Sequence, residues 1–492
     1  MRIPALFLAC AALLATALPA APAHAADKKP NILHIVVDDL GWKDVGFNGC
    51  TDFKTPNLDK LAEGGAKFTQ FYTQSMCTQT RACLMTGRYP WRYGLQTAVI
   101  PGTAGYGLDT SEYLMPQCLK DAGYATAIIG KWHLGHADLK YWPKQRGFDY
   151  AYGATIGELD YFTHGDAGVL DWFRDNKPVH EEGYTTDLIG RAAVDYIGAQ
   201  DPSKPFYLYL AFNAPHTPYL APQDLIAKHA GIEDPTRRVY AAMVDSLDAN
   251  IGKVVAALDQ KGLRDNTLIV FHSDNGGTRD AMFAGQMADV SKIKIPCDNG
   301  PYRGGKGQLF EGGCRVAACA SWPGRIQPGV VTGMFHAVDL YPTIAALAGA
   351  STAKCKPLDG VNVWDTIASN KASPRTELVY NIEPFRAGLR QGDWKLIWRT
   401  LVPTSVDLYN LAEDPYEKNN LAAAHPDKVA AMQERVNALG KECAKPLFLA
   451  YLAETGLKHA PPIIASEEGQ PRALIGGGSP TITDEGFGDG DH

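Results

Sequence analysis

The chain has 492 residues, of which 45% are hydrophobic and 21% are charged. This balance is typical of a globular protein, and the length exceeds that of an average single domain. A formal net charge of −7 without any basic run argues against nucleic acids and anionic membranes as partners.

The N-terminus has the pattern of a secretory signal. Arg2 precedes an apolar run over residues 4–18, and the small-residue sequence Ala23-His24-Ala25 follows. The run is too short to span a bilayer. We expect residues 1–25 to be removed, which leaves a periplasmic or secreted protein without a membrane segment.

Ten cysteines are present, and Cys10 is lost with the predicted signal. If Cys77 is functional, the oxidising compartment allows up to four disulfides among the others, with a pairing that the sequence leaves open. These eight are Cys50, Cys83, Cys118, Cys297, Cys314, Cys319, Cys355 and Cys443.

The chain then alternates between two kinds of segment. Short apolar runs predict buried strands at residues 32–37, 125–129, 206–212, 268–271 and 316–321. Helical periodicity occurs at residues 57–66, 114–122, 185–197 and 238–261. This order predicts an α/β fold, with a large, mostly parallel sheet and helices on both faces, over residues 26–350.

A different pattern follows over residues 351–457. From residue 378 the side chains alternate with period 2 between turn signals, which predicts a small antiparallel sheet, and residues 427–441 predict a helix packed on it. Residues 458–492 are rich in Gly, Pro and acidic side chains, so we expect a loose tail.

Residues 77–88 combine a cysteine, an arginine and a helix stop. Good helix formers follow Cys77, and Gly87 stands where a helix would end. Cys77 is therefore expected near a helix N-terminus, where backbone N–H groups favour an anion, with Arg81 one turn further on. A buried structural cysteine is the alternative interpretation.

Polar residues follow four of the predicted strands. They are Asp38-Asp39, Lys131-Trp132-His133, Asn213 to His216, and Asp274 to Gly277. Ligands in open α/β sheets bind outside the carboxyl ends of the strands, so we expect one polar site there.

The chemistry of these residues indicates a metal beside an anion. Asp38 and Asp39 need a counter-charge if both are buried, and Asp274 with Asn275 would complete an all-oxygen site for Ca²⁺ or Mg²⁺. Helix capping and an Asx turn are the structural alternative.

Basic groups accompany the predicted metal site. Lys131 and His133 point the same way if their segment stays extended, and His216 lies between two prolines. Lys306 lies in a glycine-rich loop that would let it reach an anion. These residues supply a general acid, a general base and an anion clamp.

These segments resemble the sulfatase family. Residues 77–87 are similar to its signature Cys-x-Pro-Ser-Arg-x-x-x-Leu-Thr-Gly, and residues 130–135, Gly-Lys-Trp-His-Leu-Gly, resemble its second signature. The resemblance covers about residues 29–421 and is closest to arylsulfatases of the N-acetylgalactosamine-4-sulfatase kind. It implies hydrolysis of a sulfate monoester of the arylsulfatase type, with a sulfated sugar as one candidate substrate.

The resemblance also implies the cofactors. Cys77 would be oxidised by a maturation enzyme to formylglycine, whose hydrated aldehyde is the nucleophile and forms a covalent sulfate intermediate. Asp38, Asp39, Asp274 and Asn275 would bind Ca²⁺ together with that residue.

The resemblance assigns the remaining roles as follows. Arg81 would hold the hydrate, and Lys131 with Lys306 would bind the sulfate oxygens. His133 would take the proton that releases sulfate, and His216 with Lys306 would protonate the leaving alcohol.

Two positions depart from the signature. Gln79 stands where the family has proline, and Thr80 where it has serine or another small residue. The maturation enzyme reads that proline, so conversion of Cys77 is expected to be inefficient or to need a more tolerant maturation system.

Two alternative functions fit the same residues. One is a phosphate or phosphonate ester hydrolase of the same superfamily, and the other is a non-catalytic carbohydrate-binding protein that retains the fold, which the changes at Gln79 and Thr80 motivate.

Overall fold

The computed structural model describes residues 28–166, 168–279, 295–457, 463–465 and 471–473. The predicted signal lies outside these residues, as does most of the predicted tail, within which two short strands pair, β19 Ile463–Ala465 and β20 Pro471–Ala473. No described helix combines the length and apolar character needed to cross a membrane.

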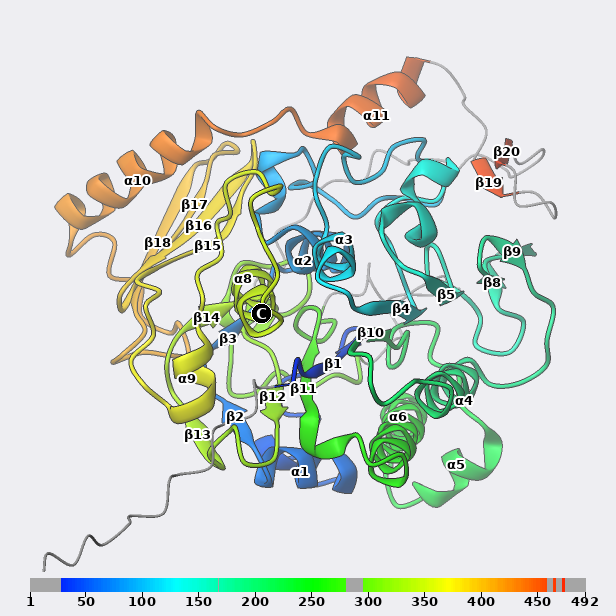
Figure 1. Ribbon diagram of the computed structural model, residues 1–492. Coiled ribbons are helices and arrows are strands. Elements are labelled where there is room, and N and C mark those ends of the chain that lie inside the picture. The colour runs from blue at the N-terminus through cyan, green and yellow to red at the C-terminus, as the bar shows by residue number, and fades with distance from the viewer. Residues whose placement is uncertain (1–27, 167, 280–294, 458–462, 466–470, 474–492) are drawn as a thin grey trace, which may run out of the picture.

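A ten-stranded mixed sheet forms the centre of the molecule (Figure 1). In spatial order its strands are β13 Gly329–Val331, β2 Ala66–Phe68, β12 Ala318–Ser321, β11 Thr267–Ser273, β1 Asn31–Val37, β10 Phe206–Ala211, β4 Ala125–Gly130, β5 Tyr150–Gly153, β8 Phe173–Arg174 and β9 Lys177–Pro178. Strands β11, β1, β10, β4 and β5 run parallel. The strand predicted at residues 316–321 forms as β12, but it pairs antiparallel with β11.

Helices cover both faces of this sheet, as predicted. Figure 1 shows α1 Pro56–Glu63, α4 Thr185–Gly198, α5 Gln223–Lys228 and α6 Pro235–Gln260 on one side. On the other side are α2 Cys77–Thr86, α3 Met115–Asp121 and α8 Ala337–Leu347. Along β1, Leu33 and Ile35 join the core under α4 and α6, whereas Ile32 and Val36 join the core under α2 and α8. This alternation explains why both faces of the strand are apolar.

A second, antiparallel sheet follows, as predicted from the period-2 pattern. It consists of β15 Glu377–Ile382, β16 Arg386–Gln391, β17 Trp394–Arg399 and β18 Ser405–Asn410, and α10 Pro426–Gly440 packs on it. Leu389 and Leu396 of this sheet belong to the same apolar core as α2 and α8. The second sheet therefore shares one apolar core with the helices on that face of the first sheet.

The remaining elements are short connections. They are α7 Glu311–Cys314, α9 Trp364–Ser369, α11 Leu447–Leu457, the paired strands β3 Phe71–Tyr72 with β14 Phe335–His336 and β6 Gly165–Asp166 with β7 Val169–Leu170, and 3-10 helices at Gly46–Asn48, Pro90–Arg92, Leu139–Tyr141, Pro143–Arg146 and Arg264–Asn266.

The prediction of up to four disulfides is wrong for this structure. All nine cysteines in the described part of the chain are free, and six of them are buried. Cys83 of α2 and Cys118 of α3, for example, pack into the apolar core. Such thiols behave as small hydrophobic side chains and need no bridge to fill their place.

Candidate active site

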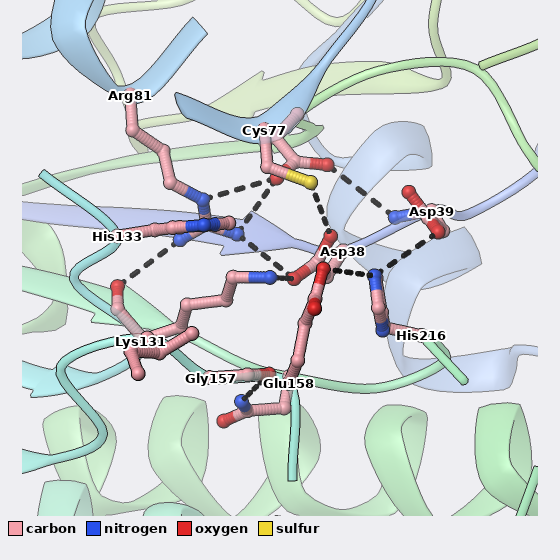
Figure 2. A network of polar contacts seen from close by, with 12 residues as sticks. Asp38, Asp39, Cys77, Arg81, Lys131, His133, Gly157, Glu158 and His216 are labelled. Atoms are coloured by element: carbon pink, nitrogen blue, oxygen red, sulfur yellow. Dashed lines mark hydrogen bonds and ion pairs between the residues drawn. The ribbon is translucent and has the colours of Figure 1, made fainter. Parts of the chain in front are cut away.

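The candidate site lies where four neighbouring strands end in register. Val37 of β1 pairs with Ser273 of β11, and Val36 pairs with Ala211 of β10, which in turn pairs with Gly130 of β4. The polar segments that follow these strands therefore meet at one edge of the sheet (Figure 2). The structure thus brings together every residue that the sequence singled out for the site.

Cys77 is the first residue of α2, as expected. Its side chain is fully buried, and its Sγ lies 3.4 Å from Asp38 Oδ1. Burial and the nearby charge of Asp38 raise the pKa of this thiol well above its usual value. The cysteine itself is therefore a neutral thiol rather than a thiolate nucleophile.

Arg81 follows one turn further along α2 and is also fully buried. Its Nε and Nη2 donate to Asp274 Oδ2 at 3.1 and 2.7 Å, and its Nη1 donates to the backbone oxygen of Lys131 at 3.1 Å. Its Nη2 is also 3.4 Å from Asp38 Oδ2. The guanidinium is thus fixed between the ends of β1, β4 and β11.

Two lysines each approach one carboxylate of the Asp38-Asp39 pair. Lys131 Nζ lies 2.6 Å from Asp38 Oδ2, and Lys306 Nζ lies 2.8 Å from Asp39 Oδ2. All four side chains are at least 95% buried. Burial alone would raise the pKa of Asp38, but Lys131, His216 and Arg81 together lower it well below its usual value.

The glycine-rich loop explains how Lys306 reaches the site. The backbone N–H of Lys306 donates to Gly277 at 3.2 Å, and that of Gly307 donates to Ser75 at 2.7 Å. Gly304 and Gly307 adopt φ values of 76° and 82°, which favour glycine. The loop is thereby held between the end of β11 and the start of α2.

The two histidines are held differently. His133 Nε2 lies 3.1 Å from the backbone oxygen of Ile100, and its Nδ1 has no hydrogen-bond partner among the described residues. Burial, Lys131 and Arg81 lower the pKa of His133 well below its usual value, so the ring is neutral. The extended segment expected here does not form, because β4 ends at Gly130 and His133 has a φ of 57°.

The residues present fit a divalent cation. Ligand atoms of Asp38, Asp39, Cys77 and His216 lie within 4.8 Å of one another. Beside them, the buried Asn275 donates through Nδ2 to Asp39 at 2.7 Å, while its Oδ1 has no hydrogen-bond partner among the described residues. A carbonyl oxygen left unpaired next to clustered carboxylates suits an oxygen-binding cation such as Ca²⁺.

The predicted ligand Asp274 lies at the edge of this group. Its Oδ1 accepts from the backbone N–H of Asp39 at 3.3 Å, and its Oδ2 faces Arg81. Burial and the charge of Asp38 raise the pKa of Asp274 to about 7. His216 is closer to the clustered carboxylates than was predicted, since the sequence assigned it only to acid–base chemistry.

Two residues at the site carried no assigned role in the sequence. Thr278 Oγ1 donates to Asp39 Oδ2 at 3.0 Å, and Glu158 Oε1 lies 3.9 Å from His216 Nε2 (Figure 2). The Glu158 side chain is 53% exposed, whereas the surrounding charged groups are buried. The one feature of the sequence that marks the position of Glu158 is the preceding glycine. Gly157 has a φ of 80°, and a Cβ there would lie 2.5 Å from the Lys131 side chain.

With this geometry established, comparison with known proteins identifies the family. Residues 30–350 match the sulfatase family model. The chain belongs to the sulfatase family and is a sulfuric ester hydrolase.

Among the relatives, mouse arylsulfatase J is 32% identical over 85% of this chain and 77% of its own length. Human arylsulfatase A is 32% identical over 87% and 89%, and human N-acetylgalactosamine-6-sulfatase is 34% identical over 73% and 69%. The crystal structure of Ps i-CgsB in complex with k-i-k-neocarrahexaose superimposes with a TM-score of 0.76 and 33% identity, covering 85% of this chain and 94% of that one. The likeness to a 4-sulfatase in particular stays a prediction.

Proposed function

We propose that the chain hydrolyses a sulfate monoester with a formylglycine formed from Cys77. The observation that carries the proposal is the position of Cys77, a buried neutral thiol at a helix start with Arg81, Lys131 and Lys306 converging on the adjacent carboxylates. A neutral thiol is a poor nucleophile, whereas the same position suits a hydrated aldehyde.

Three basic side chains would recognise the sulfate. Arg81 would hold the hydrate at residue 77, because its guanidinium already bridges Asp274 and the backbone of Lys131. Lys131 and Lys306 would turn their ammonium groups from Asp38 and Asp39 toward the sulfate oxygens. Such fixed donors stabilise the negative charge that develops during transfer.

Two groups absent from the structure complete this proposal. Asp38, Asp39, Asp274 and Asn275 would hold Ca²⁺, or Mg²⁺, which would supply a positive charge opposite the sulfate oxygens. The hydrated aldehyde of residue 77 would supply the attacking oxygen and a second hydroxyl that allows the resulting covalent sulfate ester to be cleaved.

The charge states and contacts of Lys306 and His133 support their assignment as general acid and general base. Lys306 is held protonated, because Asp39 outweighs the effect of burial and raises the pKa of Lys306 well above its usual value. With His216 beside it, Lys306 would donate a proton to the leaving alcohol. Neutral His133, with Nδ1 unpaired, would accept the proton whose loss releases sulfate.

A sulfated saccharide is the substrate class that the relatives favour. Ps i-CgsB forms a complex with k-i-k-neocarrahexaose, and other relatives are named N-acetylgalactosamine-6-sulfatases. We further propose that the chain acts in the periplasm or outside the cell after removal of residues 1–25, and that a formylglycine-generating enzyme converts Cys77.

Mass spectrometry of tryptic peptides tests the nucleophile. In active protein, the peptide that ends at Arg81 should be lighter by the exchange of the Cys77 thiol for an aldehyde. The following peptide, residues 82–88, contains Cys83 and should keep its thiol mass as an internal control. An unmodified thiol in fully active protein would overturn the mechanism, and faster turnover of nitrophenyl phosphate than of nitrophenyl sulfate would favour the phosphatase alternative.

A further inference from the structure

A cavity of about 480 Å³ lies beside the second sheet, away from the Cys77 side chain. The hairpin between β15 and β16, the end of β17 and the segment between α10 and α11 surround it. The side chains that carry the argument are Gln96, Glu383, Arg386, Trp398, Lys441 and Lys445. We refer to this cavity as the α10 pocket.

The charge of the α10 pocket is positive. Lys441 and Lys445 are exposed at its rim, and Arg386 is half-buried in its wall. Glu383 is the only acidic side chain among the lining residues, and it forms an ion pair with Arg386. The two rim lysines therefore provide positive charge that is available to an anionic ligand.

One buried polar atom among the described residues that line the pocket has no partner, the side-chain oxygen of Gln96. The Gln96 side chain is 1% exposed and donates through Nε2 to the backbone oxygen of Ala444 at 2.9 Å, which fixes the orientation of the amide. Its Oε1 has no hydrogen-bond partner among the described residues. An unpaired acceptor of this kind can be satisfied by a ligand hydroxyl or by a water molecule. The half-buried ring of Trp398 offers an apolar wall.

The pocket is joined to the active site by short contacts. Arg386 Nη1 donates to the backbone oxygen of Gly307 at 2.6 Å, and Gly307 is the neighbour of Lys306. On the other side, Gln96 lies four residues before Ile100, whose backbone oxygen contacts His133. Two separate stretches of chain thus connect the pocket wall to the catalytic groups.

We propose that the α10 pocket binds a second, anionic sugar unit of the same oligosaccharide whose sulfate ester is hydrolysed at residue 77. The positive rim would bind its sulfate or carboxylate, Gln96 Oε1 would accept from a hydroxyl, and Trp398 would pack against the ring. This inference rests on the proposed function, and it makes the enzyme selective for chains over isolated sulfate esters.

Binding measurements separate the pocket from catalysis. Cys77→Ala protein, which cannot consume the ligand, is titrated calorimetrically with hexasaccharides of sulfated galactan and of sulfated glycosaminoglycan, and with their desulfated forms. At least one sulfated hexasaccharide should bind. Trp398→Ala, or the Lys441→Ala, Lys445→Ala pair, should raise the Kd of that hexasaccharide about tenfold or more. Trp394→Ala, on the same β17, and Lys428→Ala, on the preceding α10, lie outside the pocket and serve as matched controls.

Turnover gives the second readout. In protein with intact Cys77, the pocket variants should lower the ratio of kcat/KM for the hexasaccharide to that for nitrophenyl sulfate. The Lys441→Ala, Lys445→Ala pair should do so with unchanged thermal unfolding, because both side chains are exposed. Absence of binding by every sulfated hexasaccharide, equal binding of the desulfated forms, or pocket variants that bind like the parent would each overturn the proposal. Failure of the proposed function is distinguishable, because hexasaccharides would then bind at the pocket without turnover of any sulfate ester.

Discussion

The ammonium of Lys306 lies 3.0 Å from Nε2 of His216. A lysine ammonium only donates, so His216 Nε2 accepts, and its Nδ1–H donates to the backbone oxygen of Thr217 at 2.6 Å. Burial and the charge of Lys306 lower the pKa of His216, which agrees with a neutral ring. In the proposed mechanism Lys306 would therefore supply the proton, and His216 would orient it.

Replacing the proton donor should affect poor leaving groups most. Lys306→Met is expected to lower kcat for an alkyl or sugar sulfate by about a hundredfold to ten-thousandfold, because these alcohols need protonation as they leave. The loss should be smaller for nitrophenyl sulfate, whose phenolate leaves without help. Steady-state rates over a series of leaving groups measure this, with Lys371→Met on the exposed surface as the control. Equal losses across the series would assign Lys306 to sulfate binding alone.

The candidate metal site predicts stabilisation by a divalent cation. With free Ca²⁺ at about 100 times its Kd, the free energy of unfolding should rise by about 2.7 kcal/mol. Chelation should remove this gain, and Asn275→Ala should reduce it, because Asn275 Oδ1 is an unpaired buried oxygen beside the carboxylates. Calorimetric unfolding with and without Ca²⁺ measures the effect, and Asp365→Asn on the surface is the control. A melting temperature independent of Ca²⁺ and Mg²⁺ would contradict the site.

The central fold was predictable because its signals are local. Residues 32–37 and 206–212 are apolar on both faces, and such runs form the buried strands β1 and β10. The direction of β12 was not predictable, since parallel and antiparallel pairing depend on the route of the chain rather than on the strand itself. The end of α1 is a similar case. Helical periodicity suggested residue 66, but Gly64 ends the helix, and Gly65 passes so close to β12 that a Cβ would lie 2.1 Å from the Ala320 oxygen.

The candidate site was predictable as a set of residues but not as a set of contacts. The ends of parallel strands share one edge, so Asp38, Lys131 and Asp274 were expected to meet. Which basic side chain faces which carboxylate depends on side-chain geometry that the local sequence does not determine. Glu158 shows this limit, because its loop follows a strand without periodicity or a motif, and only the fold brings it to His216.

Glu158 should discriminate between leaving groups by charge. Its carboxylate is half-exposed near the proposed proton donor, where it would repel a substrate with a second negative charge close to the ester oxygen. Glu158→Gln is expected to raise kcat/KM for a carboxylated aryl sulfate several-fold relative to the neutral aryl sulfate. Asp160→Asn, two residues further on, is the control, because an amide oxygen can still accept from the backbone N–H groups of Phe162 and Thr163. An unchanged ratio would show that Glu158 does not face the leaving group.

Glu311 should hold the second sheet to the rest of the protein. This buried carboxylate accepts from Tyr72, Tyr380 and Lys395 at 2.7, 2.7 and 2.9 Å, and so links β3, β15 and β17 to the loop after Lys306. Glu311→Gln leaves Lys395 with a single buried carboxylate, that of Glu417 at 2.7 Å, and weakens the bonds from Tyr72 and Tyr380. It should lower the free energy of unfolding by about 1.5–3 kcal/mol. Glu377→Gln, which breaks a more exposed pair with Arg435, should cost less than about 1 kcal/mol. Equal costs in denaturant unfolding would show that Glu311 is not the attachment point.

Restoring the signature proline should increase conversion of Cys77. Gln79 is the third residue of α2, and the first bond of the helix is donated by Thr80 to Met76, so the N–H lost in proline has no partner in the helix. The Gln79 side chain is 3% exposed with its Oε1 unpaired, so little is lost by removing it. Gln79→Pro is expected to raise the fraction of peptide ending at Arg81 that carries the aldehyde, with specific activity rising in proportion. Thr80→Ser is the matched control at the other departure, since it keeps the hydroxyl that bonds to Gln74. If Gln79→Pro changes activity while the aldehyde fraction stays constant, Gln79 acts in the folded site and not in maturation.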